Sequence, residues 1–185
     1  MKNLNEIIRE EIESFIEFDS RKIKAVIFDF DFTLVDTTCY TPLGPYAKAH
    51  RDWSAYDKYM PQTRVYAGVK ELIQYLMDRN ILVLVVTNSK QSVAQKTLDY
   101  HGIKYNGIRG AQGPRMPKKL RMLALLRKGN ISPDEAISVG DLPTDEVQSN
   151  AAGIKFVGCT WGNDMVNGIN NPLDLIKIIE EYEEN

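Results

Sequence analysis

Residues 23–33 read IKAVIFDFDFT, a run of mainly apolar residues that ends abruptly in two aspartates, Asp29 and Asp31. The run is rich in β-branched and aromatic side chains, which is typical of a strand buried on both faces of a parallel sheet. In open α/β sheets the ligand binds outside the carboxyl ends of the strands. Asp29 and Asp31 therefore stand where a sheet of this kind would carry its chemistry.

The same kind of run recurs along the chain and alternates with helical patterns. Apolar runs occupy residues 81–87, 136–140 and 154–159, and helical patterns occupy residues 69–79, 91–101, 117–128 and 143–152. Glycine follows the last three helical patterns directly, as is usual just beyond a helix. Alternating strands and helices indicate βαβ crossovers, so we predict an α/β fold, a doubly wound three-layer α/β/α sandwich around a central parallel sheet.

Two segments stand apart from this alternation. Apolar residues at three- and four-residue spacing predict an amphipathic helix within residues 1–20, which would cover the domain's own sheet or meet a second subunit. Residues 36–67 are rich in proline and aromatic side chains and are too long for a simple connection. We predict that they form a small cap or lid within a catalytic domain that spans residues 21–185.

Composition and charge narrow the class of protein. The apolar content of 43% and the charged content of 26% are those of a packed globular domain. The formal net charge is −2 and no run of Lys or Arg could follow a phosphate backbone, so a nucleic-acid partner is not expected. The acids near the N-terminus argue against a signal peptide or a membrane span, so no membrane association is expected. Cys39 and Cys159 form no metal-binding pattern, and reduced thiols fit a cytoplasmic location.

Acids and hydroxyls gather where three of the apolar runs end. They are Asp29, Asp31 and Thr33 after the first run, Thr87, Asn88 and Ser89 at the end of the second, and Asp141 and Asp145 after the third. Carboxylates crowded at one sheet edge repel one another and lose hydration unless a cation neutralises them, which predicts a hard divalent ion, with Mg²⁺ as the default. On a regular strand Asp29 and Asp31 would point to the same side, where one could attack as a nucleophile while the other donates a proton.

These groups occur in three short motifs. DFDFT at residues 29–33 resembles the first motif, DxDxT or DxDxV, of the haloacid dehalogenase-type superfamily of phosphatases. VVTNS at residues 85–89 resembles its second motif, and GDLPTD at residues 140–145 resembles its fourth, GDxxxD. The match covers residues 23 to about 162 in the family's order. The loop GCTWG at residues 158–162 resembles that of phosphoglycolate-phosphatase-like members, and the short insert implies a minimal cap.

The resemblance implies a role for each aspartate. Asp29 would form an aspartyl-phosphate, while Asp31 would protonate the leaving group and then activate the water that hydrolyses the intermediate. Asp141 would bind Mg²⁺ together with Asp29 and the backbone carbonyl of Asp31, and Asp145 would help to position the metal or its waters. Thr87 would hold a phosphoryl oxygen through its hydroxyl.

The family's third motif is a lysine, usually followed by proline at the start of a helix, and here the chain departs from the pattern. The sequence reads Arg115-Met116-Pro117-Lys118-Lys119, so Met116 stands at the lysine position if Pro117 is the family proline. A cation is still required beside the phosphoryl group. We predict Lys118 for this catalytic and substrate-binding role, with Arg115 and Lys119 as the alternatives.

The resemblance predicts a Mg²⁺-dependent phosphatase that hydrolyses a small phosphorylated metabolite, with Thr33 and Asn88 as further substrate-binding residues. A phosphomutase would need a cap large enough to shield the intermediate from water, and the insert is short. The irregular third motif alone favours a catalytically silent phosphate-binding scaffold, and the aromatic insert alone favours a nucleic-acid end phosphatase. A two-component receiver domain would carry adjacent acids on its first strand, whereas these acids alternate. Because the predicted cap is small, the site would be open, and a neighbouring subunit could help to determine specificity. A homo-oligomer is therefore a possible partner state.

Overall fold

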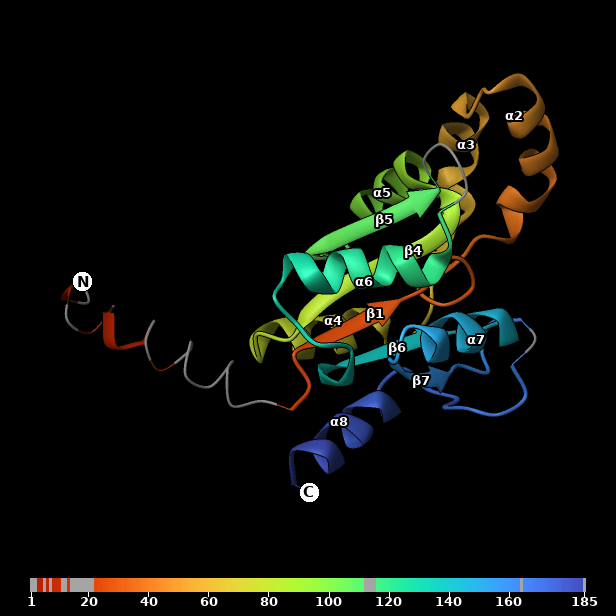
Figure 1. Ribbon diagram of the computed structural model, residues 1–185. Helices are drawn as coiled ribbons and strands as arrows, with labels where there is room; N and C mark the ends of the chain where they lie inside the picture. The colour runs from red at the N-terminus through yellow and green to blue at the C-terminus, as the bar shows by residue number, and fades with distance from the viewer. Residues whose placement is uncertain are drawn as a thin grey trace.

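The computed structural model describes residues 22–111, 116–163 and 165–184, together with residues 3, 4, 6, 8–10 and 13. Its centre is a parallel sheet of five strands in the order β5–β4–β1–β6–β7 (Figure 1). The strands are β1 (Ala25–Phe28), β4 (Leu82–Lys90), β5 (Gly107–Ala111), β6 (Ala136–Gly140) and β7 (Lys155–Gly158). In the middle strand Phe28 is level with Val85 of β4 and Val139 of β6. This register brings the carboxyl ends of three strands together.

Helices cover both faces of the sheet. On one face lie α4 (Val69–Asp78), α5 (Gln91–Tyr100) and α8 (Asp174–Glu184), and on the other lie α6 (Lys118–Lys128) and α7 (Pro143–Ala151). The side chains of β1 alternate between the two layers, because Val26 and Phe28 belong to the core under the first set of helices and Ala25 and Ile27 to the core under the second. This arrangement confirms the predicted three-layer α/β/α sandwich.

Outside residues 36–67, one observed strand and one observed α-helix are absent from the sequence-based prediction. Strand β5 reads GIRGA and lies at the edge of the sheet, and its two glycines give it none of the apolar run that marks the other strands. Helix α8 buries Leu175 and Ile179, one turn apart, against the first core. The predicted elements agree with the observed ones to within a few residues, except that β1 ends at Phe28, before the first aspartate.

Residues 36–67, called the insert from here on, fold outside the sheet. They contain a 3₁₀ turn η1 (Thr38–Leu43), helices α2 (Gly44–His50) and α3 (Ser54–Tyr59), and a second 3₁₀ turn η2 (Met60–Gln62). The short antiparallel pair β2 (Val35–Asp36) and β3 (Arg64–Val65) closes its base. Figure 1 shows α2 and α3 beyond the carboxyl ends of β4 and β5. The insert therefore lies beyond one end of the sheet, and its role as a small cap or lid stays a prediction.

Two sequence-based predictions fall largely outside the described residues. Residues 1–20, predicted as an amphipathic helix, are described at only a few positions, where Leu4 and Ile8 are exposed. Arg115, an alternative for the third motif, is not among the described residues. In the described part of the chain, no helix is both long enough and apolar enough to cross a membrane.

Candidate active site

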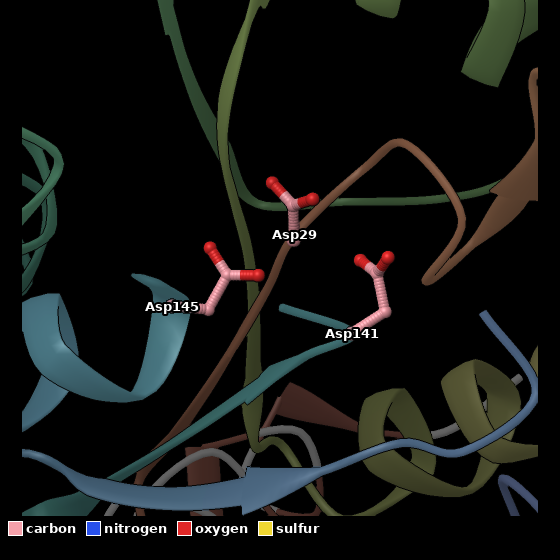
Figure 2. Close-up of side chains that lie close together, drawn as sticks. All are labelled: Asp29, Asp141 and Asp145. Carbon is pink, nitrogen blue, oxygen red and sulfur yellow. The ribbon is translucent and has the colours of Figure 1, made fainter. Parts of the chain in front are cut away.

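Three buried aspartates meet at the carboxyl ends of β1 and β6. Asp29 directly follows β1, Asp141 directly follows β6, and Asp145 lies in the first turn of α7. One carboxylate oxygen of each lies within 4.8 Å of the others, and Figure 2 shows the three carboxyl groups gathered around one space. The pairing of β1 with β6 fixes this arrangement, since Asp29 and Asp141 are the next residues after two strands in register.

Lys118 joins this group from α6, which lies on the same face of the sheet as α7. It is the first residue of α6, and its buried Nζ donates to Asp29 Oδ1 at 2.5 Å and to Asp145 Oδ1 at 2.6 Å. Lys119 is only half-buried, and its backbone N–H donates to Gln148 Oε1 at 3.2 Å. Among the described residues of the third motif, Lys118 is therefore the cation that contacts Asp29. We call Asp29, Asp31, Lys118, Asp141 and Asp145 the strand-end cluster.

The ionisation of the strand-end cluster reflects its burial. Burial raises the pKa of Asp29 to about 7, and the charges of Asp145 and Asp31 push it the same way while Lys118 opposes them. Burial also raises the pKa of Asp141. Desolvation opposes the charged ammonium of Lys118, but Asp29 and Asp145 outweigh it and hold the pKa of the lysine above its ordinary value. The carboxylates are thus short of positive charge.

The oxygen donors of this group fit a divalent metal ion. The strand-end cluster holds four aspartates and one buried lysine, and the charge of the buried Arg121 acts on Asp29. With all four carboxyl groups ionised, two formal negative charges remain. Asp29, Asp141 and Asp145 present carboxylate oxygens close enough to share one ion, and hard cations prefer such ligands. Among the described residues, the carboxylate of Asp31 is not part of this metal-sized group.

Asp141 is held in place by three donors. Thr33 Oγ1 donates to its Oδ1 at 2.9 Å, and the side-chain amide of Asn163 donates to its Oδ2 at 2.9 Å, with the Asn163 backbone N–H at 3.3 Å. Gly162 packs so close that an added Cβ would lie 2.4 Å from Asp141 Cβ. Thr33 is buried and its carbonyl accepts from the Trp161 indole at 3.0 Å. The hydroxyl of Thr33, predicted to bind substrate, is thus occupied by Asp141.

Asp31 is bound by three hydroxyls, and no described residue forms an ion pair with it. Thr37 Oγ1 donates to Oδ1 at 2.9 Å, while Ser89 Oγ and Thr87 Oγ1 donate to Oδ2 at 2.6 and 3.1 Å. Because β1 ends at Phe28, the regular strand assumed for Asp29 and Asp31 does not extend to them. Phe32, the next residue, has φ of +58°, a left-handed conformation that costs a side chain about 1–2 kcal/mol.

Arg121 is a buried cation that the sequence reading missed. It lies one turn after Lys118 on α6 and donates from Nη1 to the Thr87 carbonyl and from Nη2 to Asn88 Oδ1. Its Nε is buried without a hydrogen-bond partner among the described residues. Asn88 itself is exposed at the end of β4. The available signal was the spacing of Lys118 and Arg121, which are three residues apart and so lie on one face of α6.

Known proteins match this chain in sequence and in fold. The family model described as haloacid dehalogenase-like hydrolase matches residues 44–159. A phosphoglycolate phosphatase of Pseudomonas putida is 25% identical over 140 residues, which cover 72% of this chain and 47% of the relative. A haloacid dehalogenase-like hydrolase structure from Streptococcus pneumoniae superimposes with a TM-score of 0.69 at 18% identity, covering 85% of this chain and 98% of that one.

The extent of these matches limits what each one shows. This chain spans about half the length of the phosphoglycolate phosphatases it matches. The structural likeness, at under 20% identity, concerns the fold alone. The family match takes in Thr87, Lys118, Asp141 and Asp145, while Asp29 and Asp31 precede it. Because that match covers more than half of the sequence, the chain belongs to the haloacid dehalogenase-like hydrolase family.

Proposed function

We propose that this chain is a Mg²⁺-dependent phosphatase that hydrolyses a small phosphomonoester through an aspartyl-phosphate on Asp29. The observation that carries the proposal is the buried carboxylate of Asp29, which lies within hydrogen-bond distance of Lys118 and within metal-sharing distance of Asp141 and Asp145. The phosphatase names among the relatives support the same class of reaction. The proposed location is cytoplasmic.

The first half of the reaction transfers the phosphoryl group to the protein. An ionised oxygen of Asp29 attacks phosphorus, and the bond from phosphorus to the leaving oxygen breaks. Asp31 gives its proton to that oxygen, so the product leaves as a neutral alcohol. The hydroxyls of Thr37 and Ser89 keep the Asp31 carboxyl group in one orientation. The Thr87 hydroxyl, which donates to Asp31 at 3.1 Å, would turn from it to the phosphoryl oxygen.

The second half returns Asp29 to its starting state. Asp31, now a carboxylate, accepts a proton from a water that attacks the phosphorus, and the bond from phosphorus to the Asp29 oxygen breaks. Inorganic phosphate leaves and Asp31 is protonated again. Lys118 offsets the negative charge that collects on the phosphoryl oxygens and keeps Asp29 ionised for attack.

A bound Mg²⁺ ion, held by Asp29, Asp141 and Asp145, would supply the charge neutralisation and the template for phosphate that this acidic site lacks. Thr33 and Asn163 orient Asp141 for that role. We assign Thr87 and Asn88, at the end of β4, to the phosphoryl and substrate side of the site. The silent-scaffold alternative loses its one argument, because Lys118 supplies a cation beside Asp29 despite the irregular third motif.

The proposal is tested with p-nitrophenyl phosphate, assayed with and without Mg²⁺, on the wild type and on Asp29→Asn. We expect turnover that requires the metal and falls by at least about 10³-fold in Asp29→Asn, because the nucleophile is lost. Hydrolysis that survives this substitution would remove Asp29 from its role. A wild type that turns over no phosphomonoester would restore the scaffold reading.

A further inference from the structure

A cavity of about 190 Å³ lies between the strand-end cluster and the insert. Asp31 lines it from the sheet, Lys90 from the last position of β4, and Lys48, Trp53 and Tyr56 from the insert. At about 30 Å³ for each water-sized group, the cavity has room for roughly six such groups. That is the size of a short leaving group, and the residue proposed to protonate the leaving oxygen is part of its wall.

The cavity wall carries positive charges that no carboxylate pairs with among the described residues. Asp31, the acid of this wall, is engaged by three hydroxyls and forms no ion pair with a described residue. Within the described part of the chain, neither Lys48 nor Lys90 is paired with a carboxylate, although other lysines are. These two ammonium groups lie beside the site proposed for the leaving group, and their positive charge would attract an anion there.

The two lysines are presented differently. Lys90 is half-buried and its Nζ lies 4.5 Å from the centre of the Trp53 ring, a cation–π contact that fixes the end of β4 against the insert. Lys48 is exposed on α2 and reaches the cavity from the rim. One ammonium is therefore held in place, and the other is free to move toward a bound group.

Contacts between the insert and α5 hold the cavity open in this shape. Tyr40 OH and Thr97 Oγ1 are 2.9 Å apart, Thr63 Oγ1 and His101 Nε2 are 2.7 Å apart, and Lys96 Nζ lies 2.7 Å from Asp57 Oδ2. These pairs tie both ends and the middle of the insert to α5 and to His101, the residue directly after it. The lysines of the cavity are thus positioned before a ligand arrives.

We propose that Lys48 and Lys90 form a subsite for a second anionic group on the substrate, a carboxylate or a phosphate carried by a short leaving group. This proposal rests on the phosphatase function proposed above and adds a substrate class to it. A phosphomonoester with a neutral leaving group of the same size would fill the cavity but leave both ammonium groups without a partner. The enzyme would then discriminate by charge more than by shape.

The experiment compares kcat/KM for two substrates of matched size, 2-phosphoglycolate and 2-hydroxyethyl phosphate, with inorganic pyrophosphate as the phosphate-bearing case. We expect the wild type to prefer 2-phosphoglycolate or pyrophosphate over the neutral ester by at least about tenfold, since a charge-assisted hydrogen bond contributes a factor of this order. Preference for one of the two anions identifies the anionic group. Equal kcat/KM for all three substrates would overturn the proposal.

Lys48→Met and Lys90→Met should each lower that preference ratio by about tenfold, and Lys90→Arg should keep most of it because it retains the charge above Trp53. Lys58→Met is the matched control, since Lys58 is exposed on α3 and does not line the cavity. A ratio that is the same in Lys48→Met, Lys90→Met and Lys58→Met would contradict the subsite. Lys48 is exposed, so its variant tests the idea even if Lys90→Met unfolds.

A binding measurement separates failure of the subsite from failure of the phosphatase proposal. Calorimetric titration of the Asp29→Asn variant with the two matched esters gives the affinity ratio without turnover. A wild type that hydrolyses neither ester, in a protein that binds 2-phosphoglycolate about tenfold more tightly, would overturn the function and uphold the subsite. Equal affinities alongside normal hydrolysis of p-nitrophenyl phosphate would do the reverse.

Discussion

Asp31 of the strand-end cluster and the residues of the insert line one cavity from two sides. Different kinds of contact hold the cluster and the insert. In the cluster, Lys118 is buried between Asp29 and Asp145. In the insert, the ion pair of Lys96 with Asp57 joins side chains that are half exposed, 58% and 50%. A buried charge that loses its partner is strongly destabilising, whereas a surface pair contributes little. The sheet therefore carries chemistry that tolerates little change, and the insert carries contacts that can change without loss of the fold.

Lys118→Met gives the largest expected effect on the cluster. Removal of the ammonium leaves Asp29 without its cation and the developing phosphoryl charge without compensation, so kcat should fall by about 10²–10³-fold. Steady-state kinetics with p-nitrophenyl phosphate measure this, and circular dichroism checks the fold. Lys128→Met, at the exposed far end of α6, is the control. Unchanged kcat in Lys118→Met would assign the third motif to another cation, with Lys119 the first to test.

Arg121→Met probes the buried cation beside the strand-end cluster that the sequence did not reveal. The substitution leaves the buried Thr87 carbonyl and the Asn88 amide without their donor, so we expect a loss of about 1–3 kcal/mol in the free energy of unfolding. Arg127→Met, exposed in the last turn of the same helix, should cost less than about 1 kcal/mol. Urea unfolding measures both. Equal losses would mean that burial of Arg121 contributes nothing specific.

The sequence predicts the acids of the cluster well because their positions follow from the sheet. Each apolar run ends in polar residues, and parallel strands bring those ends to one edge, so Asp29 and Asp141 are neighbours although 112 positions separate them in the numbering. Prediction of Lys118 required one more fact, that α6 begins at this residue. That start directs the lysine side chain toward the edge of the sheet where the aspartates lie. A shift of the helix start by one residue would have selected Lys119.

The sequence predicts the contacts of the insert poorly because they depend on tertiary placement. The pairing of Lys90 with Trp53 and of His101 with Thr63 joins residues far apart in sequence, and no periodic pattern relates them. Strand β5 was not predicted for a local reason, because its glycines have low strand propensity. Arg121 lies between these cases, because helical spacing from Lys118 indicated its face but not its partners.

The raised pKa of Asp29 makes the stability of the metal-free protein depend on pH. Because the folded carboxyl group has a pKa of about 7 against an ordinary 3.8, folding favours its protonated form, and this contribution is lost as pH rises from about 4 through 7. In the presence of a chelator, the melting temperature of the wild type should fall by several degrees between pH 5 and pH 8. Asp29→Asn should show a smaller fall, and Mg²⁺ should raise the wild-type value most at pH 8. Parallel pH profiles for the two proteins would contradict the assignment.

The smallest effect is expected at the surface pair that ties the insert to α5. Lys96→Met and Asp57→Asn should each change the free energy of unfolding by less than about 1 kcal/mol, because both side chains stay half exposed and water replaces the lost partner. A double-mutant cycle measured by thermal unfolding gives the coupling of the pair directly. Coupling below about 1 kcal/mol, beside the much larger effect of Lys118→Met, would sharpen the contrast between the two walls of the cavity. A coupling above about 2 kcal/mol would break it, because the insert would then be fixed as firmly as the sheet, and its specificity could not change independently of stability.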